Sequence, residues 1–191
     1  MHGVKTKAKH LTLEPEAIVE LFKPARLEIF ESLQVAGASS AADLAERLGR
    51  KVDTLYYHLK KLQAIGVIMA SKEGTGGGLG RPGVVYELVA HRVGMNLDLT
   101  SPRAREALVK GSSAVLRLAD RDVKDALDLP NTRLEGSRRN MLVRRYRARL
   151  TPADLKLANS HIATLHALFT DRSGASKGKF HVITTVLAPL E

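Results

Sequence analysis

The sequence predicts an α+β protein, and three observations support this fold class. Three short amphipathic helical patterns follow one another between residues 24 and 62. Two strand patterns then flank a glycine-rich loop, and helix and strand patterns alternate again from residue 101 onwards. The expected architecture is an N-terminal helical domain with a hairpin, over residues 14–95, followed by a small α+β domain over residues 96–191.

Each of the three helical patterns places apolar residues three and four positions apart. The patterns comprise Leu27, Ile29, Phe30 and Leu33, then Ala41, Leu44, Ala45 and Leu48, and finally Leu55, Leu59 and Leu62. Gly49 separates the second pattern from the third, where a tight turn needs a residue that tolerates positive φ. Two short helices joined in this way predict a helix-turn-helix.

The hairpin follows directly. Residues 67–73 and 84–90 have strand character, and residues 74–83 between them include six glycines. A glycine-tipped hairpin after the third helix predicts a winged helix-turn-helix, whose usual partner is duplex DNA.

Several runs of the sequence resemble the bacterial ArsR-type winged-helix repressors. These runs are SAADLAERLG at residues 40–49, TLYYHLKKL at 54–62, IGV at 65–67 and the wing-like GRPGVVYEL at 80–88. The resemblance covers roughly residues 20–92. It implies a sequence-specific DNA-binding transcriptional regulator, expected here to be a dimeric cytoplasmic repressor, and leaves the sensed signal open.

The third helix is expected to enter the major groove. Leu55, Leu59 and Leu62 would anchor it, which leaves the opposite face free for DNA. The expected DNA-binding residues of this helix and the preceding turn are Arg50, Lys51, Asp53, Thr54, Tyr56, Tyr57, Lys60 and Lys61. The alternative is a solvated helix face, against which two adjacent exposed tyrosines argue. Arg81 is expected to reach a minor groove from the wing, and the alternative there is a loop without a fixed contact.

The composition of the chain limits the kinds of partner and site that we expect. The chain carries a net charge of +10, which favours a polyanion, although residues 96–191 hold +7 of it and residues 1–95 only +3. It has no cysteine, which excludes disulfides and the cysteine metal site of metal-sensing ArsR-type proteins. No apolar run approaches the about 18 residues of a membrane span. Residues 1–13 lack the apolar block of a secretory signal and are expected to form a disordered arm.

No enzyme, cofactor or metal site is predicted. Residues 78–83 match the GxGxxG dinucleotide fingerprint literally, but they lead into a strand, whereas that motif opens a helix. His161 and His166 lie five positions apart and so do not share a helix face, as a metal pair would. No pairing of nucleophile and base stands out elsewhere.

The second half begins with a predicted helix at Ser101-Pro102. Its apolar stripe consists mostly of small residues: Ala104, Ala107, Leu108, Gly111, Ala114, Val115 and Leu118. Small residues allow close helix approach, so the stripe is expected to contact either a second subunit or its own domain. A later helix is predicted from Thr151-Pro152 to Phe169, burying Leu155, Ala158, Ile162, Leu165 and Phe169.

Two strands are predicted around that later helix, at residues 140–150 and 180–190. Six arginines occur between residues 138 and 149. A solvated strand face with salt bridges is the favoured interpretation of them, and an anion-binding patch is the alternative. The last strand is apolar on both faces, which predicts burial in a sheet or a subunit interface. The whole second half is expected to dimerise or to bind an unidentified small-molecule effector.

One alternative function stays open. The winged helix can instead serve as a protein- or RNA-interaction module without operator binding. Alanine at the exposed tyrosines and lysines of the third helix separates the two hypotheses, since it should abolish DNA binding without changing the oligomeric state.

Overall fold

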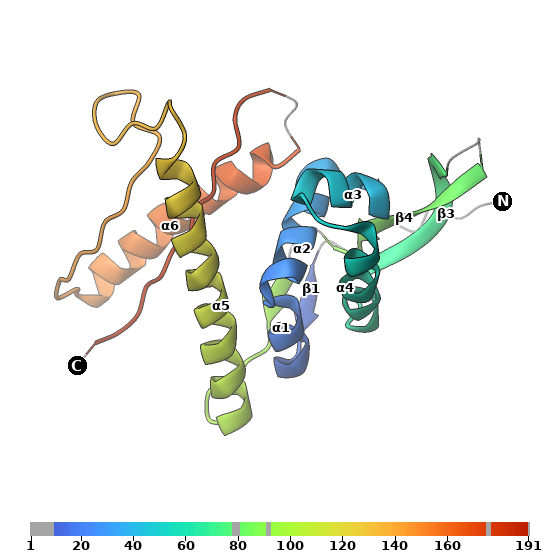
Figure 1. Ribbon diagram of the computed structural model, residues 1–191. Coiled ribbons are helices and arrows are strands. Elements are labelled where there is room, and N and C mark those ends of the chain that lie inside the picture. Colours follow the sequence, from blue (N-terminus) through green and yellow to red (C-terminus); the bar gives the residue numbers. More distant parts are fainter. Residues whose placement is uncertain (1–9, 78–80, 91–92, 175–176, 191) are drawn as a thin grey trace. The chain divides into compact units, whose positions relative to one another are not determined.

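The computed structural model describes residues 10–190 except 78–80, 91–92 and 175–176, with backbone only for the other residues from 72 to 83. The helices are α1 (Pro15–Leu21), α2 (Pro24–Ala36), α3 (Ala41–Leu48), α4 (Val52–Ala64), α5 (Pro102–Leu127) and α6 (Pro152–Arg172). The strands are β1 (Leu11–Leu13), β2 (Ser39–Ser40), β3 (Ile68–Gly77), β4 (Arg81–Leu88) and β5 (Val93–Met95) (Figure 1). This mixture confirms the α+β class.

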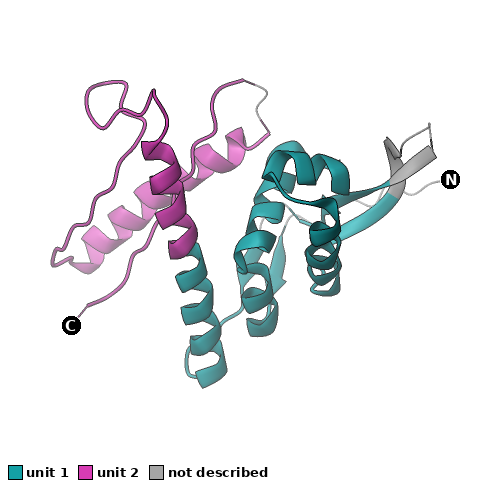
Figure 2. Ribbon diagram, in the orientation of Figure 1, with its two compact units in different colours: residues 1–115 teal, residues 116–191 magenta. Residues whose placement is uncertain are grey.

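The chain divides into two compact units, residues 1–115 and 116–191, with α5 running through the boundary (Figure 2). The first unit contains the three predicted helices as α2, α3 and α4. Their apolar stripes form its core, in which Ile29, Leu44, Leu55, Leu59 and Leu62 have no exposed surface.

Local signals fix the ends of α3. Ser40 accepts a hydrogen bond from the Asp43 amide, and the Asp43 carboxylate accepts one from the Ser40 amide, which forms a capping box. Gly49 ends the helix at φ 60°, the left-handed conformation expected for the turn. The turn therefore joins α3 to α4 as the predicted helix-turn-helix requires.

The hairpin extends further than the sequence predicts. Residues 74–83 were expected to be loop, but β3 continues through Gly77 and β4 begins at Arg81, with Gly74 paired to Gly83. Register shifts occur between Ser71 and Gly77. Such bulges interrupt the alternation of side chains, so the period-two sequence pattern ends before the strand itself ends. β2 adds a third strand, giving the order β2-β4-β3.

Residues 1–13 are not all a disordered arm, as was expected. Leu11–Leu13 form β1, which pairs in parallel with Val93–Met95 of β5. Leu13 is buried, so the ladder is held by an apolar side chain as well as by backbone hydrogen bonds. Residues 1–9 lie outside the described part of the chain.

The small-residue stripe of α5 packs within its own unit. Ala104, Ala107, Gly111 and Ala114 are buried. A Cβ added to Gly111 would lie 3.2 Å from the Phe22 ring and 3.6 Å from Ile18. Close approach to α1 therefore explains these small residues: the stripe packs within the chain, but against a helix of residues 14–95 rather than against the predicted second domain.

The second unit differs most from expectation. Residues 140–150 and 180–190 form no strand, because no strand of the described chain pairs with them. α6 begins at its Thr151–Asp154 capping box, as predicted, and ends at Arg172. However, it buries no residue, and Leu155 and Leu165 are exposed rather than in a core. The apolar spacing of α6 is thus not matched by a covering surface within the described part of the chain.

Across the described residues, none of the helices combines the length and apolar character that crossing a membrane requires.

Candidate nucleic-acid interface

α4 has one face fixed to the protein and one face open. Leu55, Leu59 and Leu62 lie on its inner face with no exposed surface, against α1, α2 and α3. This burial fixes the rotation of the helix about its axis and so decides which side chains face outwards. The predicted anchoring stripe is therefore confirmed.

The outer face brings most of the predicted site residues together. Tyr56 and Tyr57 are 52% and 58% exposed, which is unusual for large aromatic side chains without a partner. Five further predicted residues are exposed on α4 and at its start: Lys51, Asp53, Thr54, Lys60 and Lys61. The face thus presents three ammonium groups and two phenols, groups that contact phosphates and base edges.

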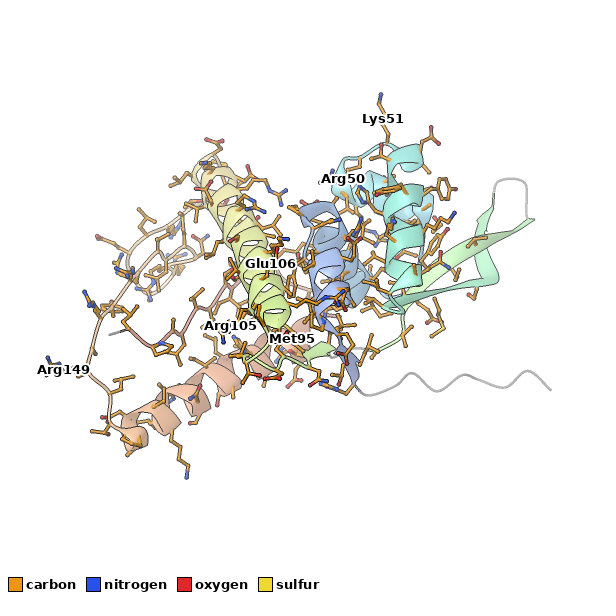
Figure 3. The ribbon with its side chains drawn as sticks, turned by 90° about the horizontal axis from the view of Figure 1, so that it is seen from below. Arg50, Lys51, Met95, Arg105, Glu106 and Arg149 are labelled. Atoms are coloured by element: carbon orange, nitrogen blue, oxygen red, sulfur yellow. The ribbon has the colours of Figure 1, made fainter. Side chains whose placement is uncertain are left out.

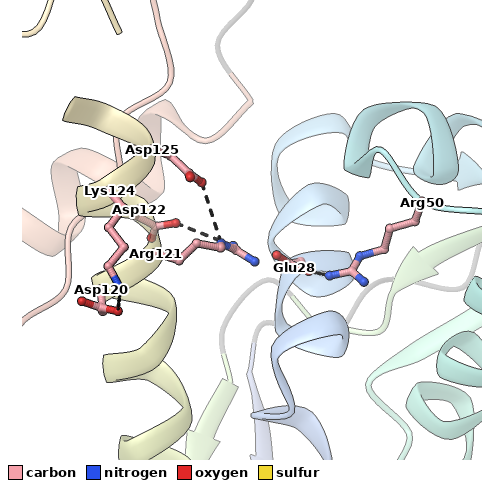
Figure 4. A network of polar contacts seen from close by, with 7 residues as sticks. All are labelled: Glu28, Arg50, Asp120, Arg121, Asp122, Lys124 and Asp125. Atoms are coloured by element: carbon pink, nitrogen blue, oxygen red, sulfur yellow. Dashed lines mark hydrogen bonds and ion pairs between the residues drawn. The ribbon is translucent and has the colours of Figure 1, made fainter. Parts of the chain in front are cut away.

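The two basic residues of the turn before α4 point in different directions. Lys51 points away from the protein beside the first turn of α4 (Figure 3). Arg50 instead reaches across to α2, where its Nη2 donates to Glu28 Oε2 at 2.5 Å (Figure 4). The guanidinium of Arg50 therefore has a structural partner, and its charge is partly neutralised before any phosphate approaches.

Arg26 belongs to the site, although it was not predicted to. This residue of α2 is only 1% exposed, and its guanidinium donates to the Glu20 carbonyl at 2.8 Å and to the Glu20 carboxylate. It also lies 5.9 Å from the centre of the Tyr57 ring. The sequence contains a signal for this role. Position 26 lies at helical core spacing with Ile29, Phe30 and Leu33, and a buried arginine needs an acidic or polar partner.

The Tyr57 ring is placed by cations. Arg26 lies at 5.9 Å and Lys61 Nζ at 5.8 Å from its centre, both within cation–π distance. The His58 ring meets it edge-on, with centroids 5.3 Å apart. The phenol is thus held in position while more than half of its surface stays available to a ligand.

His58 lies beneath this cluster. Burial lowers its pKa below the usual 6.5, and the positive charges of Arg26, Arg50 and Lys23 lower the pKa further. Its Nδ1 is buried and has no hydrogen-bond partner among the described residues. The neutral form of the His58 imidazole therefore fits this packed position. A packing role is also what its place beside the leucine stripe predicts.

The wing places Arg81 at the first residue of β4, paired with Gly77 of β3. Its side chain lies outside the described residues, as do residues 78–80 at the tip. The predicted minor-groove contact therefore stays a prediction. Within the described residues, no three histidine, aspartate or glutamate side chains gather as a metal site would.

Comparison with known proteins identifies the type of domain to which α3 and α4 belong. A family model for a helix-turn-helix domain matches residues 23–69, which span α2 to the start of β3. No curated protein matches the chain. Residues 23–69 are thus a helix-turn-helix domain, which indicates a DNA-binding regulator in general.

Proposed function

We propose that this protein is a dimeric, sequence-specific transcriptional repressor that reads its operator with α4. One observation carries the proposal. A helix anchored by three fully buried leucines presents two exposed tyrosines and three exposed lysines on and beside its opposite face. The helix-turn-helix match supports it, because the second helix of that motif is the one that enters the major groove.

The exposed lysines and tyrosines make different contributions to DNA binding in this proposal. Lys51, Lys60 and Lys61 supply phosphate contacts, which give affinity without sequence preference. Tyr56 and Tyr57 supply the aromatic and hydroxyl surface that meets base edges and thymine methyl groups. The β3–β4 hairpin is the wing, from which Arg81 reaches a flanking minor groove.

Dimerisation and repression complete the proposal. A single helix of this length reads only a few base pairs, so a second copy is needed for specificity in a genome. The second unit supports this, because it leaves its apolar residues exposed in one chain. Repression follows from the resemblance to ArsR-type proteins and from simple occupancy of the operator.

The test is selection of bound sequences from random duplex DNA, followed by affinity measurements on the selected site. We expect an enriched inverted repeat, and we expect the Tyr57→Ala, Lys60→Ala double variant to lose binding while its oligomeric state is unchanged. Lys156→Ala on α6 is the matched control for loss of one exposed lysine. Unchanged affinity of the double variant contradicts the assignment of α4. Absence of any enriched sequence favours the protein- or RNA-interaction module.

A further inference from the structure

A continuous basic segment lies between α5 and α6. Its six arginines are Arg138, Arg139, Arg144, Arg145, Arg147 and Arg149. No aspartate or glutamate interrupts them, so residues 138–149 carry a charge of +6 in a chain whose net charge is +10. Residues 1–95, which contain the helix-turn-helix domain, carry only +3. Most of the positive charge of the chain therefore lies outside the exposed face of α4.

The structure removes the favoured interpretation of these arginines, a strand face with salt bridges. Residues 140–150 form neither a helix nor a strand and run as an open coil into α6 (Figure 1). All six arginine side chains are exposed, and none forms an ion pair among the described residues. Arg149 projects away from the chain (Figure 3). The alternative interpretation, an anion-binding patch, is therefore the one that the described residues support.

The acidic residues on either side of the segment have other contacts. Asp154 accepts hydrogen bonds from the amide and the hydroxyl of Thr151, at 3.0 and 2.6 Å, and so caps α6. The aspartates near the end of α5 pair with cations of the same helix, Asp120 with Lys124 and both Asp122 and Asp125 with Arg121 (Figure 4). The charge of the arginine segment is therefore not neutralised by these carboxylates.

Guanidinium groups without a carboxylate partner are suited to phosphates. Each one donates two parallel hydrogen bonds to phosphate oxygens in a fixed planar geometry. Tyr146, which is 85% exposed between the arginines, adds a hydroxyl that also hydrogen-bonds to phosphate. Such contacts recognise a polyanion by its charge and carry no sequence preference. Duplex DNA is the polyanion that the helix-turn-helix domain of the same chain indicates.

We propose that residues 138–149 are a second DNA-contacting surface, which binds the phosphate backbone of the duplex whose bases α4 reads. The inference rests on the proposed function and adds the segment that supplies much of the electrostatic affinity. Because both surfaces belong to one chain, binding through α4 makes the arginine contact intramolecular and raises its effective concentration. Phosphate oxygens lie on the outside of the duplex, so an open coil reaches them without entering a groove.

Salt titration of duplex binding by the full chain tests this surface. The variant Arg145→Gln, Arg147→Gln, Arg149→Gln removes three exposed charges that form no ion pair among the described residues, so the contacts of the fold stay intact. For each bound copy, we expect the slope of log affinity against log salt to become shallower by about 3. The loss should be the same on the selected operator and on an unrelated duplex, which leaves the ratio of the two affinities unchanged.

Two matched variants separate this effect from net charge and from folding. Lys156→Gln, Lys177→Gln, Lys179→Gln removes three charges from other exposed positions of the second unit and should retain the wild-type slope. Arg→Lys at positions 145, 147 and 149 keeps the charge and should also retain that slope, because counterion release depends on charge. Circular dichroism of all three variants checks that each has the helix content of the wild type.

The outcomes distinguish this surface from the proposed function. Equal slopes for the wild type and the arginine-to-glutamine variant overturn the inference and leave operator reading by α4 intact. Equal losses in the arginine-to-glutamine and lysine-to-glutamine variants overturn it as well, because they reflect net charge alone. Weaker binding to single-stranded RNA with unchanged binding to duplex DNA also overturns it. If selection finds no preferred sequence while the arginine-to-glutamine variant still loses its slope on duplex DNA, the proposed function fails and this surface stands.

Discussion

Lys60 and Tyr57 lie on the exposed face of α4, and we propose that they make different contacts with DNA. Lys60→Ala removes one ammonium group, so we expect weaker binding to all sequences alike. The slope of log affinity against log salt should fall by about 1. Titration of the selected duplex and of an unrelated duplex at several salt concentrations measures both effects. A loss confined to the selected sequence contradicts a phosphate contact for Lys60.

Tyr57→Ala is expected to change sequence preference as well as affinity, because we propose that the ring contacts base edges and not phosphates alone. Its placement by Arg26 and Lys61 makes the phenol a preorganised contact. Repeating the selection with the variant measures the change. The same consensus from both proteins would show that Tyr57 reads no base.

The lowered pKa of His58 predicts that the free energy of unfolding depends on pH. Its pKa in the folded protein is held below 6.5 by burial and by nearby cations, so the unfolded chain takes up a proton more readily. The free energy of unfolding should therefore fall as the pH is lowered from above 6.5 towards the folded pKa. Chemical denaturation of the wild type and of His58→Gln at several pH values measures this. Gln at position 58 should flatten the decline, whereas His161→Gln, an exposed change on α6, should retain it; equal declines in all three proteins contradict the prediction.

At the scale of elements, the turn between α3 and α4 sets the direction in which α4 runs. Gly49 has φ 60° and no neighbouring atom within 4 Å of an added Cβ, so only backbone strain opposes a side chain there. We expect Gly49→Ala to lower the free energy of unfolding by about 1–2 kcal/mol. Gly174→Ala, also without a neighbour and without a positive φ, should change it little. A neutral Gly49→Ala would show that the turn has another accessible conformation.

The elements also show what the sequence alone could predict. α2, α3 and α4 followed from the leucine spacing and from Gly49, because these helices bury their apolar faces within their own unit. β2 was not predicted, because two serines carry no periodic signal and pair only where β4 lies beside them. Arg26 differs from β2, because its core spacing signals a buried charge in the sequence, although its partners Glu20 and Tyr57 are known only from the fold.

The predicted strands at residues 140–150 and 180–190 illustrate a different limit. Their alternation is a property of the sequence, but a ladder needs a second strand, and the chain does not provide one in its described part. None of the five predicted face residues of α6 is buried, and Leu155 and Leu165 are exposed. The strand predictions and the predicted burial along α6 were therefore wrong for the described residues, because periodicity alone cannot say whether a partner strand or a covering surface exists.

At the scale of the whole molecule, a two-fold dimer restricts the operator. Two copies must place their α4 helices in successive major grooves on one side of the duplex, so the half-sites lie about 10 base pairs apart as an inverted repeat. The wings then face flanking minor grooves, and A/T-rich flanks should strengthen binding through their narrow width. Exchanging those flanks for G/C pairs, with the half-sites kept, measures the contribution of the wing. Equal affinity for both flanks would exclude the minor-groove contact of Arg81.

Footprinting on the selected fragment tests the central claim, that two copies of this helix-turn-helix read one operator through α4. We expect two protected half-sites in inverted orientation. Insertion of about five base pairs between them turns one half-site to the other side of the duplex and should abolish joint protection. A footprint over a single half-site, or one indifferent to the five-pair insertion, would contradict a symmetric dimer on DNA.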